Sequence, residues 1–122
     1  MADKTSLNTV YLVTGSSPVT LEIIIGAIGQ TAKTIASIGK KIIVDDYKGS
    51  LPEKEIGNAE ELDGRVLYIN TIIADTSKDT NFTEMILRLR GGVTFREYVL
   101  NKEVKEEGDA QPYDCIIEFI KI

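Results

Sequence analysis

The side chains of this 122-residue chain that could act as acids, bases or nucleophiles are carboxylates, tyrosines, lysines and one thiol, because the sequence contains no histidine. Histidine is the usual general base near neutral pH and the partner of most serine and cysteine nucleophiles. An enzyme built from this sequence would therefore depend on carboxylate pairs, lysine or tyrosine. The available carboxylates are Glu84, Glu97, Asp114 and Glu118, and alternation with apolar neighbours predicts a solvent-exposed strand face for all four. Cys115 begins an apolar stretch without a histidine partner, so we expect a buried thiol. These patterns predict a non-enzymatic protein with no catalytic residue and no cofactor.

Acidic residues cluster at three places where a cation could bind. The clusters are Asp45-Asp46, Asp75 with Asp79, and Glu60-Glu61 with Asp63. Calcium takes several hard oxygen ligands from flexible loops, and C2-like sandwiches bind calcium and anionic lipid in this way. The Asp-x-Asp spacing of that family is absent here, and acidic turns usually supply only capping side chains. We therefore expect no metal site, and keep a calcium- or carbohydrate-binding sandwich that uses its acidic loops as the alternative function.

Two short segments are similar to motifs of known families. Residues 13–17 (VTGSS), together with Tyr98 and Lys102, resemble the start and the Tyr-x-x-x-Lys pair of short-chain dehydrogenases, where the lysine lowers the pKa of a catalytic tyrosine. Gly15 is not followed by the further glycines that let a backbone approach a pyrophosphate. Residues 87–92 (LRLRGG) resemble the tail of ubiquitin, which must be terminal, but here the chain continues beyond them. We interpret the first segment as a turn and the second as a strand followed by a hairpin turn.

Alternation of apolar and polar residues dominates the second half of the chain and predicts strands. Residues 65–76 place Leu67, Ile69, Thr71 and Ile73 on one face, and residues 82–90 do the same with Thr83, Met85, Leu87 and Leu89. Further strands are expected at residues 10–14, 41–46, 93–104 and 114–122. The acidic and polar stretches 48–64 and 105–112 are typical of loops, the first with room for one helical turn.

Gly91 and Gly92 separate two of these strands. A three-residue loop over residues 90–92 would pair Leu89 with Val93 and Leu87 with Phe95, so that the apolar faces agree. A glycine would then be available for the left-handed position that such loops require. The sequence thus predicts a hairpin with this register.

Residues 18–38 are open to two interpretations. As a helix, the segment has Ser17 as N-cap, Pro18 in the first position and Gly39 just past its end. As two strands, it is rich in Ile, Thr and Val and turns near Gly26. We favour two strands. The expected fold is a single domain over residues 1–122, an all-β antiparallel sandwich of about seven or eight strands, and the alternative is an α+β fold with one helix at residues 18–38 on an antiparallel sheet.

The composition of the chain limits the classes of partner and the cell compartment that we expect. A net charge of −5, from 19 acidic and 14 basic side chains, argues against nucleic-acid binding, which requires a basic surface. No apolar run is long enough to insert into a membrane, and residues 1–10 lack the pattern of a signal peptide. A lone cysteine cannot form an internal disulfide. We expect a cytoplasmic protein, or one exported without a classical signal peptide.

Several predicted strands are apolar on both faces, which is more apolar surface than one small core can bury. Surplus apolar strand surface indicates a second sheet or a partner subunit. We therefore hypothesise a protein-interaction or structural module, a subunit of a homo- or hetero-oligomeric assembly, that acts through a sheet face or edge. The residues expected on its interaction surface are Tyr68, Ile72, Ile86 and Arg88.

Overall fold

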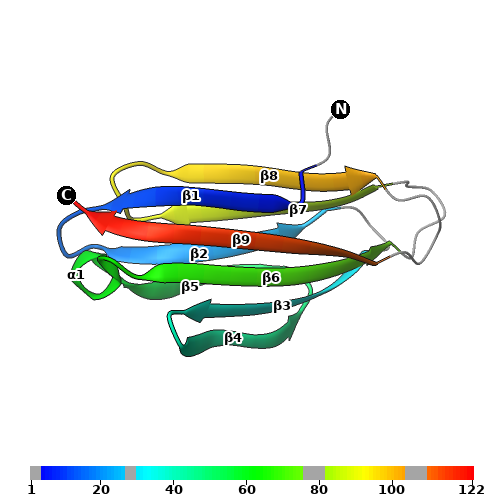
Figure 1. Cartoon of the computed structure of the whole chain (residues 1–122), viewed down its shortest axis with the longest axis horizontal. Helices are drawn as coiled ribbons and strands as arrows, with labels where there is room; N and C mark the ends of the chain where they lie inside the picture. Colours follow the sequence, from blue (N-terminus) through cyan, green and yellow to red (C-terminus); the bar gives the residue numbers. More distant parts are fainter. Residues whose placement is uncertain (1–3, 27–29, 76–81, 104–109) are drawn as a thin grey trace.

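The computed structural model describes residues 4–26, 30–75, 82–103 and 110–122. These residues form two stacked sheets (Figure 1). The described part of the chain contains nine strands and one short helix. They are β1 (Ser6–Val13), β2 (Pro18–Ile25), β3 (Gln30–Ile38), β4 (Lys41–Lys48), β5 (Leu51–Asn58), α1 (Ala59–Leu62), β6 (Val66–Asp75), β7 (Phe82–Arg90), β8 (Arg96–Glu103) and β9 (Ala110–Lys121).

The predicted all-β sandwich is confirmed. A five-stranded sheet has the order β1-β9-β6-β3-β4, and a four-stranded sheet has the order β5-β2-β7-β8. The structure adds one feature to the antiparallel prediction. β1 and β9 pair in parallel, with Ser6 opposite Asp114 and Val13 opposite Lys121, whereas the other strand pairs are antiparallel.

Residues 18–38 form two strands, β2 and β3, so the helical alternative is wrong. The inward side chains alternate strictly, with Val19, Leu21 and Ile23 buried in β2 and Ala32, Thr34, Ala36 and Ile38 buried in β3. A helix would spread these positions around its circumference instead of placing them on one side. The two strands belong to different sheets, so the segment connects the two layers.

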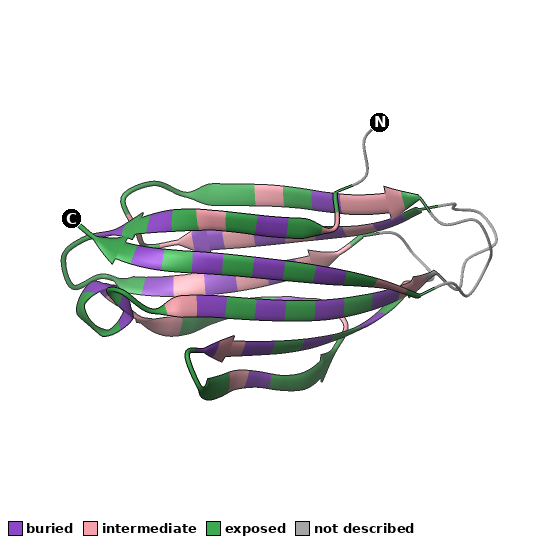
Figure 2. Cartoon of the chain, viewed as in Figure 1, coloured by how far each residue is buried: buried purple, intermediate pink, exposed green. Residues whose placement is uncertain are grey.

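The core lies between the sheets and is built mainly from alternate residues of β1, β2, β3, β6, β7 and β9 (Figure 2). The inward faces predicted for residues 65–76 and 82–90 are confirmed, since all eight of their inward side chains are buried. Tyr11 of β1 and Phe119 of β9 meet edge to face, with ring centroids 6.2 Å apart. Thr83 of β7 and Tyr113 of β9 share a hydrogen bond through their hydroxyl groups and so connect the two sheets inside the core.

The loop predicted for residues 48–64 is wrong in part, because β5 occupies its middle. Among the described strands, β5 is an edge strand that pairs with β2 alone. The pairing has register shifts, so several successive residues face solvent and alternation is lost. The expected helical turn is α1. The Asn58 side chain accepts a hydrogen bond from the Glu61 N–H, and the Glu61 carboxylate accepts one from the Asn58 N–H.

The predicted hairpin exists, but its register is wrong. Leu89 lies opposite Arg96 and Leu87 lies opposite Tyr98, so β8 begins three residues later than the three-residue loop requires. The reason is a contact with the other sheet. The Gly92 N–H donates to the Tyr11 hydroxyl at 3.0 Å, and the Val93 N–H donates to the Leu12 carbonyl at 3.0 Å. The loop therefore pairs with β1 instead of forming a tight turn.

The predicted C-terminal strand begins earlier than expected, at Ala110, so Ala110–Pro112 belong to β9 and not to a loop. The remainder of the loop predicted for residues 105–112 lies outside the described residues. None of the helices in the described part of the chain is long and apolar enough to cross a membrane.

Candidate functional site

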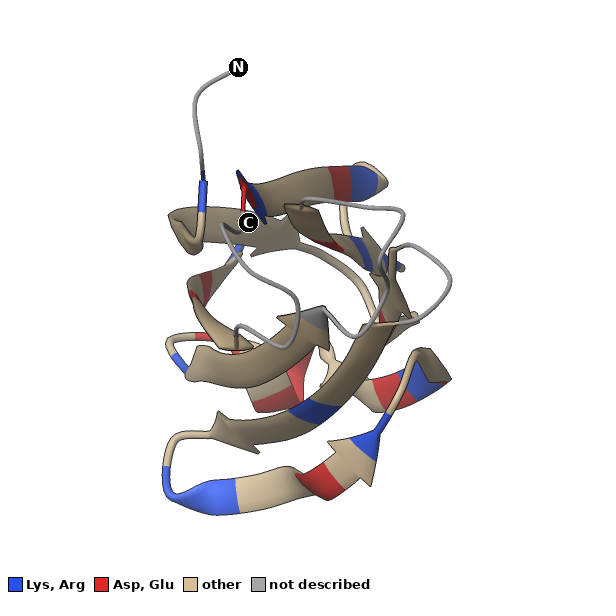
Figure 3. Ribbon diagram, turned by 90° about the vertical axis from the view of Figure 1, so that its right-hand side faces the viewer, with Lys and Arg blue, Asp and Glu red and all other residues tan. Residues whose placement is uncertain are grey.

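The outer surfaces of the two sheets differ in chemistry. On the four-stranded sheet, the Arg90 guanidinium lies 2.8 Å from the Glu22 carboxylate, and Arg88 lies 2.8 Å from Glu97 and 3.6 Å from Glu22. Hydrogen bonding to Arg90 is the main cause that lowers the pKa of Glu22. Lys, Arg, Asp and Glu are marked along the strands in Figure 3. This outer surface thus carries charges that neutralise one another within the chain.

The outer surface of the five-stranded sheet is mainly apolar, and we call it the apolar face. Eight large apolar side chains point outward from its strands, each between 37% and 58% exposed. They are Val10, Leu12, Ile35, Ile42, Tyr68, Ile72, Ile116 and Ile120. Figure 2 shows the alternation that produces this surface, with exposed positions between buried ones along β1, β9, β6 and β3.

Strand register places these side chains in contact range across the sheet. Tyr68 of β6 lies opposite Ile116 of β9 on one side and Ser37 of β3 on the other, and Ser37 lies opposite Ile42 of β4. Directly opposite residues in neighbouring strands have Cβ atoms about 5 Å apart. Tyr68 with Ile116 and Leu12 with Ile120 are directly opposite apolar pairs, whereas Val10, Ile35, Ile42 and Ile72 each have a polar or charged residue opposite them, and β6 is the central strand of five.

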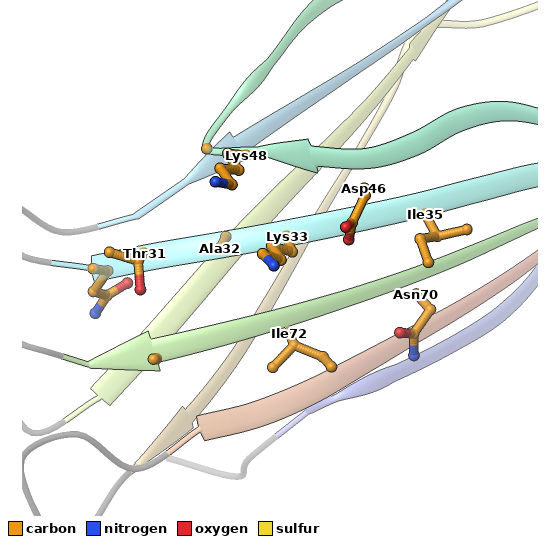
Figure 4. A pocket seen from close by; sticks show the side chains of 11 residues that line it. Thr31, Ala32, Lys33, Ile35, Asp46, Lys48, Asn70 and Ile72 are labelled. Atoms are coloured by element: carbon orange, nitrogen blue, oxygen red, sulfur yellow. The ribbon is translucent and has the colours of Figure 1, made fainter.

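A shallow groove of about 630 Å³ runs along one part of the apolar face, over β3, β4 and β6 (Figure 4). Its lining includes Ile35 and Ile72, and the charged side chains Lys33, Asp46 and Lys48. β4 is irregular here, since Asp46 has a left-handed backbone (φ 52°) and the register with β3 shifts between Thr34 and Ala36. The bulge brings the Asp46 side chain into the lining of the groove.

The balance of charge on the apolar face differs between its two sides. Asp114 and Glu118 point outward from β9, on one side of the central strand. Lys33 and Lys48, on β3 and β4, lie on the other side, together with Asp46. The Asn70 amide of β6 donates a hydrogen bond of 2.7 Å to Asp114. The face is thus acidic over β9, and slightly basic over β3 and β4.

The four residues predicted for the interaction surface lie on two different surfaces. Tyr68 and Ile72 point outward from the centre of the apolar face, 46% and 47% exposed. Ile86 and Arg88 point outward from β7 in the four-stranded sheet, where Ile86 is half-buried between Ile24 and Val99. Residues outside the prediction contribute as much to the apolar face, notably Ile35 and Ile42. Alternation within β3 was the signal for Ile35, whereas β4 is irregular and gives no such signal for Ile42.

The carboxylates considered for catalysis do not gather at one place. Glu84 and Glu97 lie on the outer surface of the four-stranded sheet, whereas Asp114 and Glu118 lie on the apolar face. Cys115 is 1% exposed, and burial raises the pKa of its thiol to about 12, which leaves it protonated and unreactive at neutral pH.

Tyr98 and Lys102 both lie on β8, where residues four apart are separated by about 13 Å. This spacing is too long for a lysine to act on a tyrosine hydroxyl as it does in the dehydrogenase pair. Tyr98 packs against the core, opposite Leu87.

The acidic cluster of Glu60, Glu61 and Asp63 has structural contacts. Glu61 belongs to the capping box of α1, and the Asp63 carboxylate accepts a hydrogen bond of 2.9 Å from the Lys121 N–H. Within residues 4–26, 30–75, 82–103 and 110–122, no three or more Asp, Glu, Cys or His side chains gather as metal ligands would. Asp79 of the second cluster lies outside the described residues.

Comparison of the chain with protein-family models, with curated proteins and with solved structures finds no match in any of the three.

Proposed function

We propose that this protein is a non-enzymatic interaction module, a subunit of a protein assembly, and that the apolar face is its contact surface. The observation that supports the proposal is the difference between the two outer surfaces. The four-stranded sheet carries a charged network and exposes two large apolar side chains, Phe82 and Val99, whereas the five-stranded sheet exposes eight. Monomeric soluble proteins rarely expose a contiguous apolar patch of more than a few hundred Å².

The shape of the surface favours a protein partner over a small molecule. Ligand sites are concave and bury most of a small ligand, whereas the apolar face is a sheet surface whose groove is shallow. Aromatic and branched apolar side chains near the centre of a flat surface, with charged residues around them, are the usual anatomy of a protein interface. Tyr68 and Ile72 occupy that central position on β6.

The test uses one substitution on each sheet at matched exposure. Ile72 on the apolar face is 47% exposed and Val99 on the four-stranded sheet is 46% exposed. We would compare the native mass of epitope-tagged wild type, Ile72→Asp and Val99→Asp in extracts of cells that make the protein. Thermal unfolding of each purified variant would verify that it is folded.

We expect wild type and Val99→Asp to elute in a complex larger than the 13.4 kDa chain, and Ile72→Asp to elute as a monomer. The proposal fails if wild type elutes as a monomer, or if Ile72→Asp and wild type have the same native mass.

A further inference from the structure

We infer that the partner of the apolar face is a second copy of this chain, docked face to face about a two-fold axis that runs along β6. This inference rests on the proposed function, because it names the occupant of the same surface. Most soluble oligomers are symmetric, and a two-fold interface uses the same patch on both subunits. An in-plane two-fold axis is the operation that places one sheet surface directly on its own copy.

The area of the face suits such a dimer. Five strands spaced about 4.8 Å apart and about eight residues long cover a footprint of roughly 600–700 Å². Stable protein interfaces bury about 800 Å² per partner, with about 600 Å² at the lower end of the range. Two copies packed in this way would form an additional pair of stacked sheets, at the usual separation of about 10 Å.

The distribution of charge selects the direction of the axis. β9, which carries Asp114 and Glu118, lies on one side of β6, and β3, which carries Lys33, lies on the other. Rotation about an axis along β6 places β9 of one copy over β3 of the other. Asp114, in the row of Asn70 and Ile35, then lies one row away from Lys33, in the row of Ile72. Rotation about an axis across the strands places β9 over β9 and brings like charges together, which is unfavourable at an interface.

The same axis also determines which strand of the second copy would fill the groove. The groove lies over β3, β4 and β6, and its apolar lining includes Ile35 and Ile72. Under the rotation it receives the β9 strand of the second copy, where Pro112 and Asp114 point outward. Asp114 would then lie within reach of Lys33, which lines the groove with Lys48 and Asp46 and forms no ion pair with any of the described residues.

Site-specific cross-linking tests the arrangement. Asn8 of β1 and Ile42 of β4 stand at opposite ends of one row across the sheet, connected by the pairings of Ile116, Tyr68 and Ser37. An axis along β6 places Asn8 of one copy over Ile42 of the other. Purified Asn8→Cys and Ile42→Cys chains, one of them tagged, would be mixed and treated with a bis-maleimide of about 10 Å, the spacing of packed sheets. The unaltered chain is the control, because buried Cys115 should not react.

We expect a dimer mass by light scattering for the purified chain. We also expect a cross-linked product in the mixture and little product from either variant alone. Ile72→Glu should raise the dimer dissociation constant by at least about 30-fold, as expected at the centre of an interface. Should Ile42→Cys itself weaken the dimer, Ile116→Cys with Ser37→Cys tests the same row on the strands next to β6.

A monomer mass at several hundred micromolar would overturn the inference. The proposed function would then depend on the extract experiment alone, where a large complex sensitive to Ile72→Asp would indicate a different protein partner. Efficient cross-linking of Asn8→Cys to itself, with no gain on mixing, would instead overturn the direction of the axis.

Discussion

The Tyr11 hydroxyl accepts a hydrogen bond from the Gly92 N–H at 3.0 Å, across the gap between the two sheets. Tyr11 belongs to β1 of the five-stranded sheet, and Gly92 belongs to the loop that joins β7 and β8 of the other. The contact is close, since a Cβ added at Gly92 would lie 2.5 Å from the Tyr11 ring and 2.6 Å from the Leu12 carbonyl oxygen. Burial is the main cause that raises the pKa of the Tyr11 hydroxyl, so it stays neutral at physiological pH.

Gly92→Ala should destabilise the fold, because the new methyl group has no space and the loop must move away from β1. We expect a loss of about 2–4 kcal/mol in the free energy of unfolding. Gly15→Ala is the matched control, since Gly15 has a positive φ of 67° but open space around its Cβ position. The control should lose only about 1 kcal/mol, from backbone strain. Urea unfolding followed by circular dichroism measures both, and equal losses would contradict the role of the Tyr11 contact.

Thr34 and Thr71 form a buried hydrogen bond of 2.8 Å between β3 and β6. Thr71→Val removes one partner and leaves the Thr34 hydroxyl buried without its bond, so we expect a loss of about 1–3 kcal/mol in unfolding free energy. The double variant Thr34→Val/Thr71→Val should lose less than the two single losses added together, because no unpaired hydroxyl remains. Chemical denaturation of the wild type, the two single variants and the double variant gives the coupling energy between the two side chains. Additive losses would show that the two hydroxyl groups do not depend on each other.

The stability of the protein should fall at alkaline pH, in part through Cys115. Burial raises the pKa of the folded thiol from 9.0 to about 12, so the unfolded chain releases this proton at lower pH than the folded chain. The contribution is fully present below pH 9 and is lost as the pH rises towards 12, by about 3–4 kcal/mol in total. Cys115→Ala should show a shallower decline in unfolding free energy between pH 9 and pH 12, and parallel curves for the two proteins would refute this origin.

Lys33→Glu should weaken self-association, because it places a carboxylate one row from Asp114 of the second copy. We expect the dimer dissociation constant to rise by about 3- to 5-fold, in the range of an exposed ion pair. Lys33→Glu combined with Asp114→Lys should restore much of the affinity, since the swap returns opposite charges to neighbouring positions across the interface. Sedimentation equilibrium of the three proteins measures the effect, and a double variant weaker than Lys33→Glu would contradict the charge pairing.

Arg88→Met should leave the native mass unchanged, although Arg88 was one of the residues expected on the interaction surface. Its guanidinium contacts Glu97 and Glu22 on the four-stranded sheet, away from the apolar face. The Glu22 carboxylate retains its 2.8 Å contact with Arg90 after the substitution. Light scattering of wild type and Arg88→Met, compared with Ile72→Glu, tests this assignment. A lower native mass for Arg88→Met than for wild type would place the contact surface on the four-stranded sheet.

The sequence predicted those parts of the fold that depend on local alternation. The buried rows of β6 and β7 followed from period-two patterns, because a strand between two neighbours in a sandwich buries one full face. The choice of strands over a helix for residues 18–38 followed from the abundance of branched residues. β5 was missed because an edge strand can be polar on both faces and because bulges disturb its pairing with β2. Its sequence therefore lacks a period-two pattern.

The tertiary structure alone decided the features that depend on distant segments. The register of β7 and β8 was predicted from matching apolar faces, but Gly91 and Gly92 instead pack against β1 and β2, and this contact moves the pairing. Tyr68, Ile72, Ile86 and Arg88 have similar outward positions in the sequence pattern, and alternation cannot say which sheet a strand joins. Strand order places the first two on an apolar surface and the last two beside an ion-pair network. Local periodicity determined which side chains point outward, and the order of strands far apart in the chain decided which of them lie together.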